Sequence, residues 1–325
     1  MIAMTWRQHR AQLLIAVGVL AALAAYLLIT GQQRASYANS IGLTACLAAK
    51  SQTCGPLAEA FFNRFGGIPQ VFTLAAGLPL LAGLFWGAPL IAREVETGTY
   101  RLAWTQSVSR NRWLTVKLLT FLAAIAAAAA ALALSFSAWL RVYSQLSAAG
   151  YTDIDRMGPP AFDLTGIAPL GTMLFAFALG TAAGALIRRT VPAMAVTLGG
   201  YLGAVLPMES LRYTAFLRPL HKSGPFSTNT IPVPPGAYEM NSGYSTASGR
   251  PVSFSDLAKA CGHPQGGGSI GIRVSCLAQK GFHISQTYQP ANRYWALQGI
   301  YTASFAAAAI ILIGVAVWWT ARRVS

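Results

Sequence analysis

The chain has 325 residues, of which 54% are hydrophobic and only 10% are charged. Together with a mean hydropathy of +0.47, this composition is typical of a membrane protein and argues against a soluble enzyme. The formal net charge of +15 comes from basic residues that flank apolar runs. No basic stripe is interleaved with aromatic residues, so nucleic-acid binding is not expected.

Six apolar runs are long enough to cross a hydrocarbon core of about 30 Å. They cover residues 13–30, 70–91, 118–140, 167–187, 191–211 and 294–320. The first run follows a basic stub, as in a secretory signal peptide, but the apolar region of a signal peptide has only about 7–15 residues. We therefore expect an all-α polytopic membrane protein with about six transmembrane helices.

A long polar stretch rich in Gly, Pro, Ser and Thr separates the fifth run from the sixth. It predicts three parts: residues 1–211 with five membrane helices and a cytoplasmic segment at 92–113, an extracellular insert at 212–293, and a last helix with a cytoplasmic tail at 294–325. Basic residues are dense at both termini, in the 92–113 segment and at Arg188-Arg189. The positive-inside rule then places both termini in the cytoplasm and the chain in the plasma (inner) membrane.

Glycines four residues apart recur in three of the predicted helices. The pairs are Gly83 with Gly87, Gly180 with Gly184, and Gly199 with Gly203. Such spacing lets two helix backbones approach closely, so we expect helix packing at these positions, with the lining of a substrate path as the alternative.

Acidic residues are scarce near the membrane. Glu209 lies at the end of the fifth run, where an intramembrane acid is a functional candidate, but Arg212 follows one turn later and predicts an interfacial ion pair. Asp153, Asp155 and Asp163 lie in a predicted outer connection at 141–165. Their spacing matches no calcium loop, so we expect a solvated loop and no metal site.

The four cysteines form two local pairs, Cys46 with Cys54 and Cys261 with Cys276, and both pairs lie in predicted outer segments. Disulfides are the first interpretation, because the outer face of a membrane is oxidising. A zinc site built from Cys261, His263, Cys276 and His283 is the alternative, although its ligand spacing fits no common framework.

Residues 92–113 carry more charge and aromatic character than a simple turn needs. Leu102, Ala103 and Val108 alternate with polar residues, which predicts a short helix on the membrane surface that offers its polar face to a cytoplasmic partner. Glu94 starts this segment. We expect it to cap backbone N–H groups of the short helix or to pair with a base on the partner.

This segment resembles one found in ATP-binding cassette (ABC) exporter permeases of the six-helix class, the type 2 permeases of type V exporters. The resemblance rests on Arg93-Glu94, Gly98-Thr99, the run from Trp104 to Arg110, and Lys117. A second stretch, Leu186 to Leu198, resembles the small permease subunits common in actinomycetes.

The resemblance implies a partner chain for ATP hydrolysis. The sequence has no Gly-Lys dipeptide, hence no Walker A loop, and no hydrolytic constellation, so this chain is not expected to be an enzyme. Two ABC ATPase subunits would bind ATP and Mg²⁺, leaving no cofactor on this chain, and a second permease copy or a paralogue would complete the transporter in the lipid membrane. The residues expected to contact the ATPase are Arg93, Glu94, Glu96, Gly98, Thr99, Trp104 and Arg110.

The function that follows is the permease subunit of an ATP-driven exporter for a hydrophobic, lipid-like or peptide-like substrate. One alternative is an ion- or proton-coupled secondary transporter or a pore. The scarcity of acids and histidines within the spans speaks against ion coupling. The other alternative is a membrane-anchored binding protein whose extracellular insert is the active part.

Overall fold

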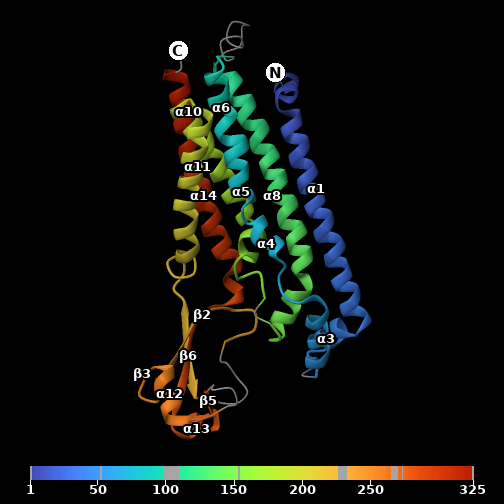
Figure 1. The fold of residues 1–325 in the computed structure, drawn as a ribbon, viewed down its shortest axis with the longest axis vertical. Coiled ribbons are helices and arrows are strands. Elements are labelled where there is room, and N and C mark those ends of the chain that lie inside the picture. Colours follow the sequence, from blue (N-terminus) through green and yellow to red (C-terminus); the bar gives the residue numbers. More distant parts are fainter. Residues whose placement is uncertain are drawn as a thin grey trace.

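The computed structural model describes residues 2–51, 53–98, 110–152, 154–225, 233–264, 270–272 and 274–323. Six helical segments in this part of the chain are long and apolar enough to cross a membrane: Leu14–Ser40, Gln70–Glu96, Leu114–Ala148, Ala168–Ile187, Thr190–Leu211 and Ala291–Thr320. They run side by side, with the N- and C-terminal ends at one end of the bundle and the insert beyond the other (Figure 1). The prediction of an all-α six-span membrane protein is therefore confirmed.

Two helices extend well past their predicted ends. Helix α1 covers Ile2–Ser40 and α8 covers Arg110–Ala148, whereas the apolar runs stop at residues 30 and 140. The polar extension of α1 packs on α8 and on the chain that follows α1. The guanidinium carbon of Arg34 lies 4.4 Å from the ring centre of Trp139 and 5.1 Å from that of Phe65. The connections between the spans on this side are therefore shorter than the sequence analysis predicted.

The chain between α1 and the second span folds into two short helices, α2 (Leu43–Ala48) and α3 (Gly55–Phe65). They are joined by the Cys46–Cys54 disulfide. Phe61 of α3 packs edge-on against Tyr143 of α8, with ring centres 5.6 Å apart. Tyr143 also donates a hydrogen bond of 3.0 Å to the carbonyl of Gly66, so α3 is fixed to the extension of α8.

The second span is broken into four pieces. They are α4 (Gln70–Ala75), α5 (Leu78–Ala82), the π-helical turn η1 (Gly83–Gly87) and α6 (Ala88–Glu96). Pro79 and Pro89 lie in the first turns of α5 and α6. Because proline has no N–H to donate to the preceding turn, the helical hydrogen bonding must be interrupted or rearranged there, and a π turn is one way to do so.

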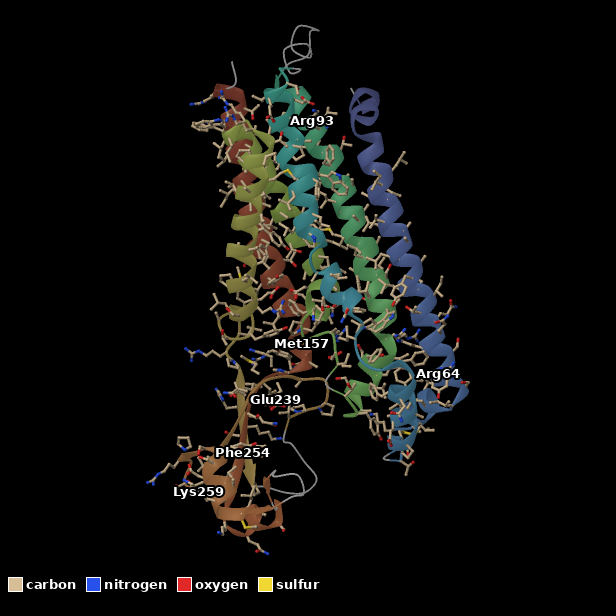
Figure 2. The ribbon with its side chains drawn as sticks, in the orientation of Figure 1. Arg64, Arg93, Met157, Glu239, Phe254 and Lys259 are labelled. Atoms are coloured by element: carbon tan, nitrogen blue, oxygen red, sulfur yellow. A yellow bond between two sulfur atoms is a disulfide. The ribbon has the colours of Figure 1, made fainter. Side chains whose placement is uncertain are left out.

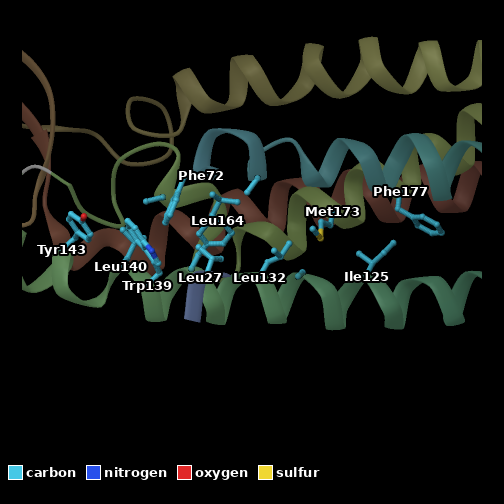
Figure 3. Close-up of a cluster of buried hydrophobic side chains, with 14 of the residues drawn as sticks. Leu27, Phe72, Ile125, Leu132, Trp139, Leu140, Tyr143, Leu164, Met173 and Phe177 are labelled. Carbon is cyan, nitrogen blue, oxygen red and sulfur yellow. The ribbon is translucent and has the colours of Figure 1, made fainter. Parts of the chain in front are cut away.

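Helix α10 (Ala168–Ile187) is the centre of the bundle and is buried over most of its length. It follows the short α9 (Ala161–Leu164) and contacts η1, α6, α8, α11 (Thr190–Leu211) and α14 (Tyr294–Arg323). Its Met173 and Phe177 face Ile125 and Leu132 of α8 in the main hydrophobic core (Figure 3). Phe72 extends this core toward the insert side, where its ring centre lies 4.6 Å from that of Trp139.

The insert contains strands that the sequence analysis did not predict. An antiparallel sheet has the order β1-β6-β2-β3, and a smaller one pairs β4 with β5. The elements are β1 (Leu220–Pro225), β2 (Tyr238–Thr246), β3 (Pro251–Val252), α12 (Phe254–Cys261), β4 (Gly262–Pro264), β5 (Ile270–Ile272), α13 (Val274–Gln279), β6 (Phe282–Gln289) and the 3₁₀ turn η2 (Ala291–Arg293). Helix α12 begins with a capping box between Ser253 and Asp256.

Candidate coupling site

Charged residues at the bundle end opposite the insert connect three of the spans. Arg93, near the end of α6, marks this end, whereas Phe254 and Lys259 lie in the insert beyond the opposite end of the bundle (Figure 2). Glu94 of α6 forms an ion pair with Lys117 of α8. Lys117 is 3% exposed and Glu94 is 12% exposed, so water has little access to either charge and the attraction between them offsets part of the cost of burial.

Glu96, two residues further along α6, reaches a different helix. Its carboxylate accepts hydrogen bonds from the backbone N–H of Thr190 at 3.1 Å and from the Thr190 hydroxyl at 2.8 Å. Thr190 is the first residue of α11, and Arg189 at the N-cap position makes no side-chain capping bond. Glu96 therefore supplies the N-terminal cap from another span, where a carboxylate also favours the helix dipole.

The turn between α10 and α11 fits this contact. Arg188 ends α10 in the left-handed conformation at φ 59° and donates its N–H to the carbonyl of Gly184. The turn is tight, because only Arg188 and Arg189 separate the end of α10 from the start of α11. Because Glu96 of α6 binds Thr190 directly after this turn, the ends of α6, α10 and α11 meet here.

Two acids of the expected site make contacts within the chain: Glu94 pairs with Lys117, and Glu96 caps α11. Their expected contacts with a short surface helix and with the ATPase stay predictions. The sequence held one signal for the pairing of Glu94 with Lys117, since Lys117 is a member of the resembling segment. Gly98 ends α6 at φ 71°, as a helix C-terminus requires. Arg93 is exposed on α6.

Part of the expected site lies outside the described residues. Thr99 and Trp104 belong to the part that the structure does not describe. Residues 99–109 between α6 and α8, where the sequence predicts a surface helix, belong to it too. Arg110 is the first residue of α8, and its side chain is also outside the described part.

Two glycine pairs hold the second span against α10. A Cβ atom at Gly83 would lie 2.5 Å from the carbonyl oxygen of Ala176, and one at Gly87 would lie 2.6 Å from that of Phe177. On the opposing helix, a Cβ at Gly180 would lie 2.7 Å from the backbone nitrogen of Ala88, and one at Gly184 would overlap the Ala88 carbonyl. Both pairs thus pack helix on helix as predicted.

Gly199 and Gly203 differ. Apart from the neighbouring backbone of α11 itself, no atom of the described residues lies within 4 Å of a Cβ built at either position. Helix packing therefore stays a prediction for these two glycines. They lie on a face of α11 that also exposes Leu202 and Leu206, so this face is turned away from the bundle.

A family model described as "ABC-2 membrane transporter related" matches residues 17–212. The chain belongs to this family. The comparisons with curated proteins and with solved structures found no match.

The ABC-2-related region contains the first five spans and both contacts of the coupling site, and it ends where the insert begins. With the six spans, membership identifies the chain as a transporter permease subunit in a membrane. The family also implies association with an ABC ATPase subunit.

A second charged cluster lies at the insert side of this ABC-2-related chain. Asp163 of α9 pairs with Arg212, which follows α11. The Arg212 guanidinium carbon lies 4.6 Å from the ring centre of Phe162 and 4.8 Å from that of Tyr213. Burial acts to lower the pKa of Arg212, but the charge and hydrogen bond of Asp163, together with Tyr213 and Tyr301, raise this pKa above its ordinary value. Two expectations were wrong: Asp163 is not a solvated loop residue, and Arg212 pairs with it rather than with Glu209.

The cysteines form both expected disulfides, Cys46–Cys54 and Cys261–Cys276. The second joins α12 to α13 across a sequence separation of 15 residues. The zinc alternative is wrong, because its two thiolates are consumed by this bond. No group of three or more potential metal-binding side chains occurs among the described residues.

Proposed function

We propose that this chain is the membrane-spanning subunit of an ATP-driven exporter and that two partner ATPase subunits bind and hydrolyse ATP with Mg²⁺. The observation that carries the proposal is the pair of contacts Glu94–Lys117 and Glu96–Thr190. They connect the helices on both sides of residues 99–109 to each other and to the start of α11.

This arrangement suits the transmission of force. A partner that pushes on residues 99–109 acts on the end of α6 and the start of α8 together. The two ends resist separation, because breaking the buried ion pair between them costs free energy. Through Glu96 the same displacement reaches the turn between α10 and α11. When ATP closes the ATPase pair, these span ends move as a unit and the transport path turns outward.

A second permease copy fits the outward face of α11. Gly199 and Gly203 leave a shallow strip along this face, and two such strips related by a two-fold axis allow close backbone approach. The cargo would then move along the surfaces near this interface. Apolar side chains such as Leu202 and Leu206 favour a hydrophobic, lipid-like or peptide-like substrate.

The proposed orientation has both termini in the cytoplasm of the plasma (inner) membrane and the insert outside. It rests on the basic residues at the coupling end. In a variant without native cysteines, a membrane-impermeant thiol reagent should modify Ser248→Cys in the insert and not Arg189→Cys in the exposed α10–α11 turn. The reverse labelling would invert the topology.

The central test is co-purification of the tagged chain with an ABC ATPase, beginning with any that a neighbouring gene encodes, followed by ATP turnover of the complex. Glu96→Ala should lower turnover while leaving membrane yield unchanged. Glu59→Gln, at an exposed position of α3, is the matched control and should have no effect. Absence of any co-purifying ATPase, or transport driven by a proton gradient alone, would overturn the proposal.

A further inference from the structure

An apolar groove lies between α1, the π-helical turn and α8, and neither the coupling site nor the α11 face includes it. Its volume is 320 Å³, within the range of about 300–1,000 Å³ that ligand pockets have. The lining includes Ile15 and Val19 of α1, Phe85 and Trp86 of η1, Ala128 of α8 and Met173 of α10.

The groove opens to the membrane. Its rim residues Ile15, Val19 and Phe85 are 69%, 54% and 54% exposed, although they lie within spans. The groove is therefore continuous with the lipid-facing surface of the bundle, so whatever enters it comes from the hydrocarbon region.

The π-helical turn builds one wall of the groove. Gly83 and Gly87 press the backbone of η1 onto α10, and Phe85 and Trp86 project from the same turn into the groove. A single π turn inside a helix is a feature often found at functional sites. Here the π turn sets the directions of two aromatic side chains at the opening of the groove. In an unbroken α-helix these side chains would point in other directions.

The sequence of the elements at the nearer end of the groove is basic. Ile15, Phe85 and Ala128 all lie in the halves of their spans nearer the coupling end. The chain has no acidic residue before Glu59 and none between Glu96 and Asp153. The two acids at the coupling end are engaged by Lys117 and Thr190. The basic residues of this end in the sequence are Arg7, Arg10, Arg93, Arg110 and Arg112.

We propose that this groove binds one acyl chain of an anionic phospholipid from the adjacent leaflet, with the headgroup at the basic coupling end. The apolar lining accepts the chain, and the positive end selects the headgroup charge. The bound lipid lies against the π-helical turn, so it adds a lipid-dependent contact to the span that carries Glu94 and Glu96.

The test uses substitutions that fill the groove with a larger side chain, introduced either from α8 or from α1. The full chain, extracted with its partners in mild detergent, is titrated with phosphatidylglycerol or phosphatidylcholine, and retained lipid is measured by native mass spectrometry. Ala128→Phe and Ala16→Phe should each weaken phosphatidylglycerol retention about tenfold, the effect of excluding roughly two methylene groups. Ala127→Phe, at the neighbouring exposed position of α8, is the matched control and should bind like the unmodified chain.

Equal retention in the filled and control variants would overturn the proposal, as would equal retention of the two lipids. If a filled variant keeps its lipid but loses cargo export, the groove belongs to the cargo and the lipid proposal fails. The readout needs no ATP hydrolysis, so its result is independent of the proposed exporter function.

Discussion

The Glu94–Lys117 ion pair leads to a sharp stability prediction. Lys117 is 3% exposed, so Glu94→Gln leaves an ammonium group with little access to water. Breaking a buried pair in this way costs about 3–5 kcal/mol. We expect the lower end, about 3 kcal/mol, because Glu94 is 12% exposed and the Gln amide oxygen still accepts a hydrogen bond. The apparent Tm should fall by roughly 5–10 °C.

The assay is thermal unfolding of the purified chain, followed by the fluorescence of its 8 Trp residues. The double variant Glu94→Leu/Lys117→Met removes both charges and should be more stable than either single variant, since neither buried charge of the pair remains. Glu59→Gln, exposed on α3, should change stability by less than about 0.5 kcal/mol. An unchanged Tm for Glu94→Gln, or a double variant that shows the summed loss of the singles, would refute a buried and mutually dependent pair.

The remaining predictions concern packing, capping and the insert. Gly180→Ala should abolish monodisperse protein, because its Cβ would lie 2.7 Å from the Ala88 nitrogen, whereas Gly314→Ala, at a position of α14 where, apart from the neighbouring part of the helix, no described atom lies within 4 Å of the added Cβ, should behave like the unmodified chain; equal yields would contradict the packing role. Glu96→Ala should speed hydrogen exchange in the first turn of α11, and unchanged exchange would show that the cap is dispensable. Cys261→Ser/Cys276→Ser should destabilise the insert by about 3 kcal/mol, seen as faster limited proteolysis, and an unaltered digestion rate would exclude this.

The sequence was informative where a residue's partner is the membrane or lies nearby along the chain. Apolar runs must be long enough to cross the hydrocarbon core, so all six spans could be predicted. The cysteine pairs were predictable because each closes a short local loop. The Gly83 and Gly180 pairs followed from spacing, although spacing alone could not distinguish them from the outward-facing Gly199 pair.

Long-range contacts could not be predicted in this way. Asp163 and Arg212 are 49 residues apart, and nothing in the sequence around either residue indicates the other. The hydropathy pattern predicted that the first helix ends at residue 30. It takes no account of tertiary contacts such as the stacking of Arg34 on Trp139, which lies beyond that point. The strands of the insert were missed because their alternation is incomplete: Phe282, Ile284 and Tyr288 of β6 alternate with polar residues, but Gln286 interrupts the apolar series.

The attachment of the insert has a mechanical consequence. Strand β1 follows α11, β6 leads into α14, and the two strands are paired from Leu220–Tyr288 to Pro225–His283. At the root, the Gln289 side chain donates hydrogen bonds of 2.7 Å to the carbonyls of Tyr213 and Leu217. Six paired residues at about 3.3 Å each form a lever arm of about 20 Å. A change of ~10° in the tilt of its base would swing the far end by roughly 3–4 Å on such an arm, so the insert magnifies small rearrangements of the fifth and sixth spans beyond the end of the bundle.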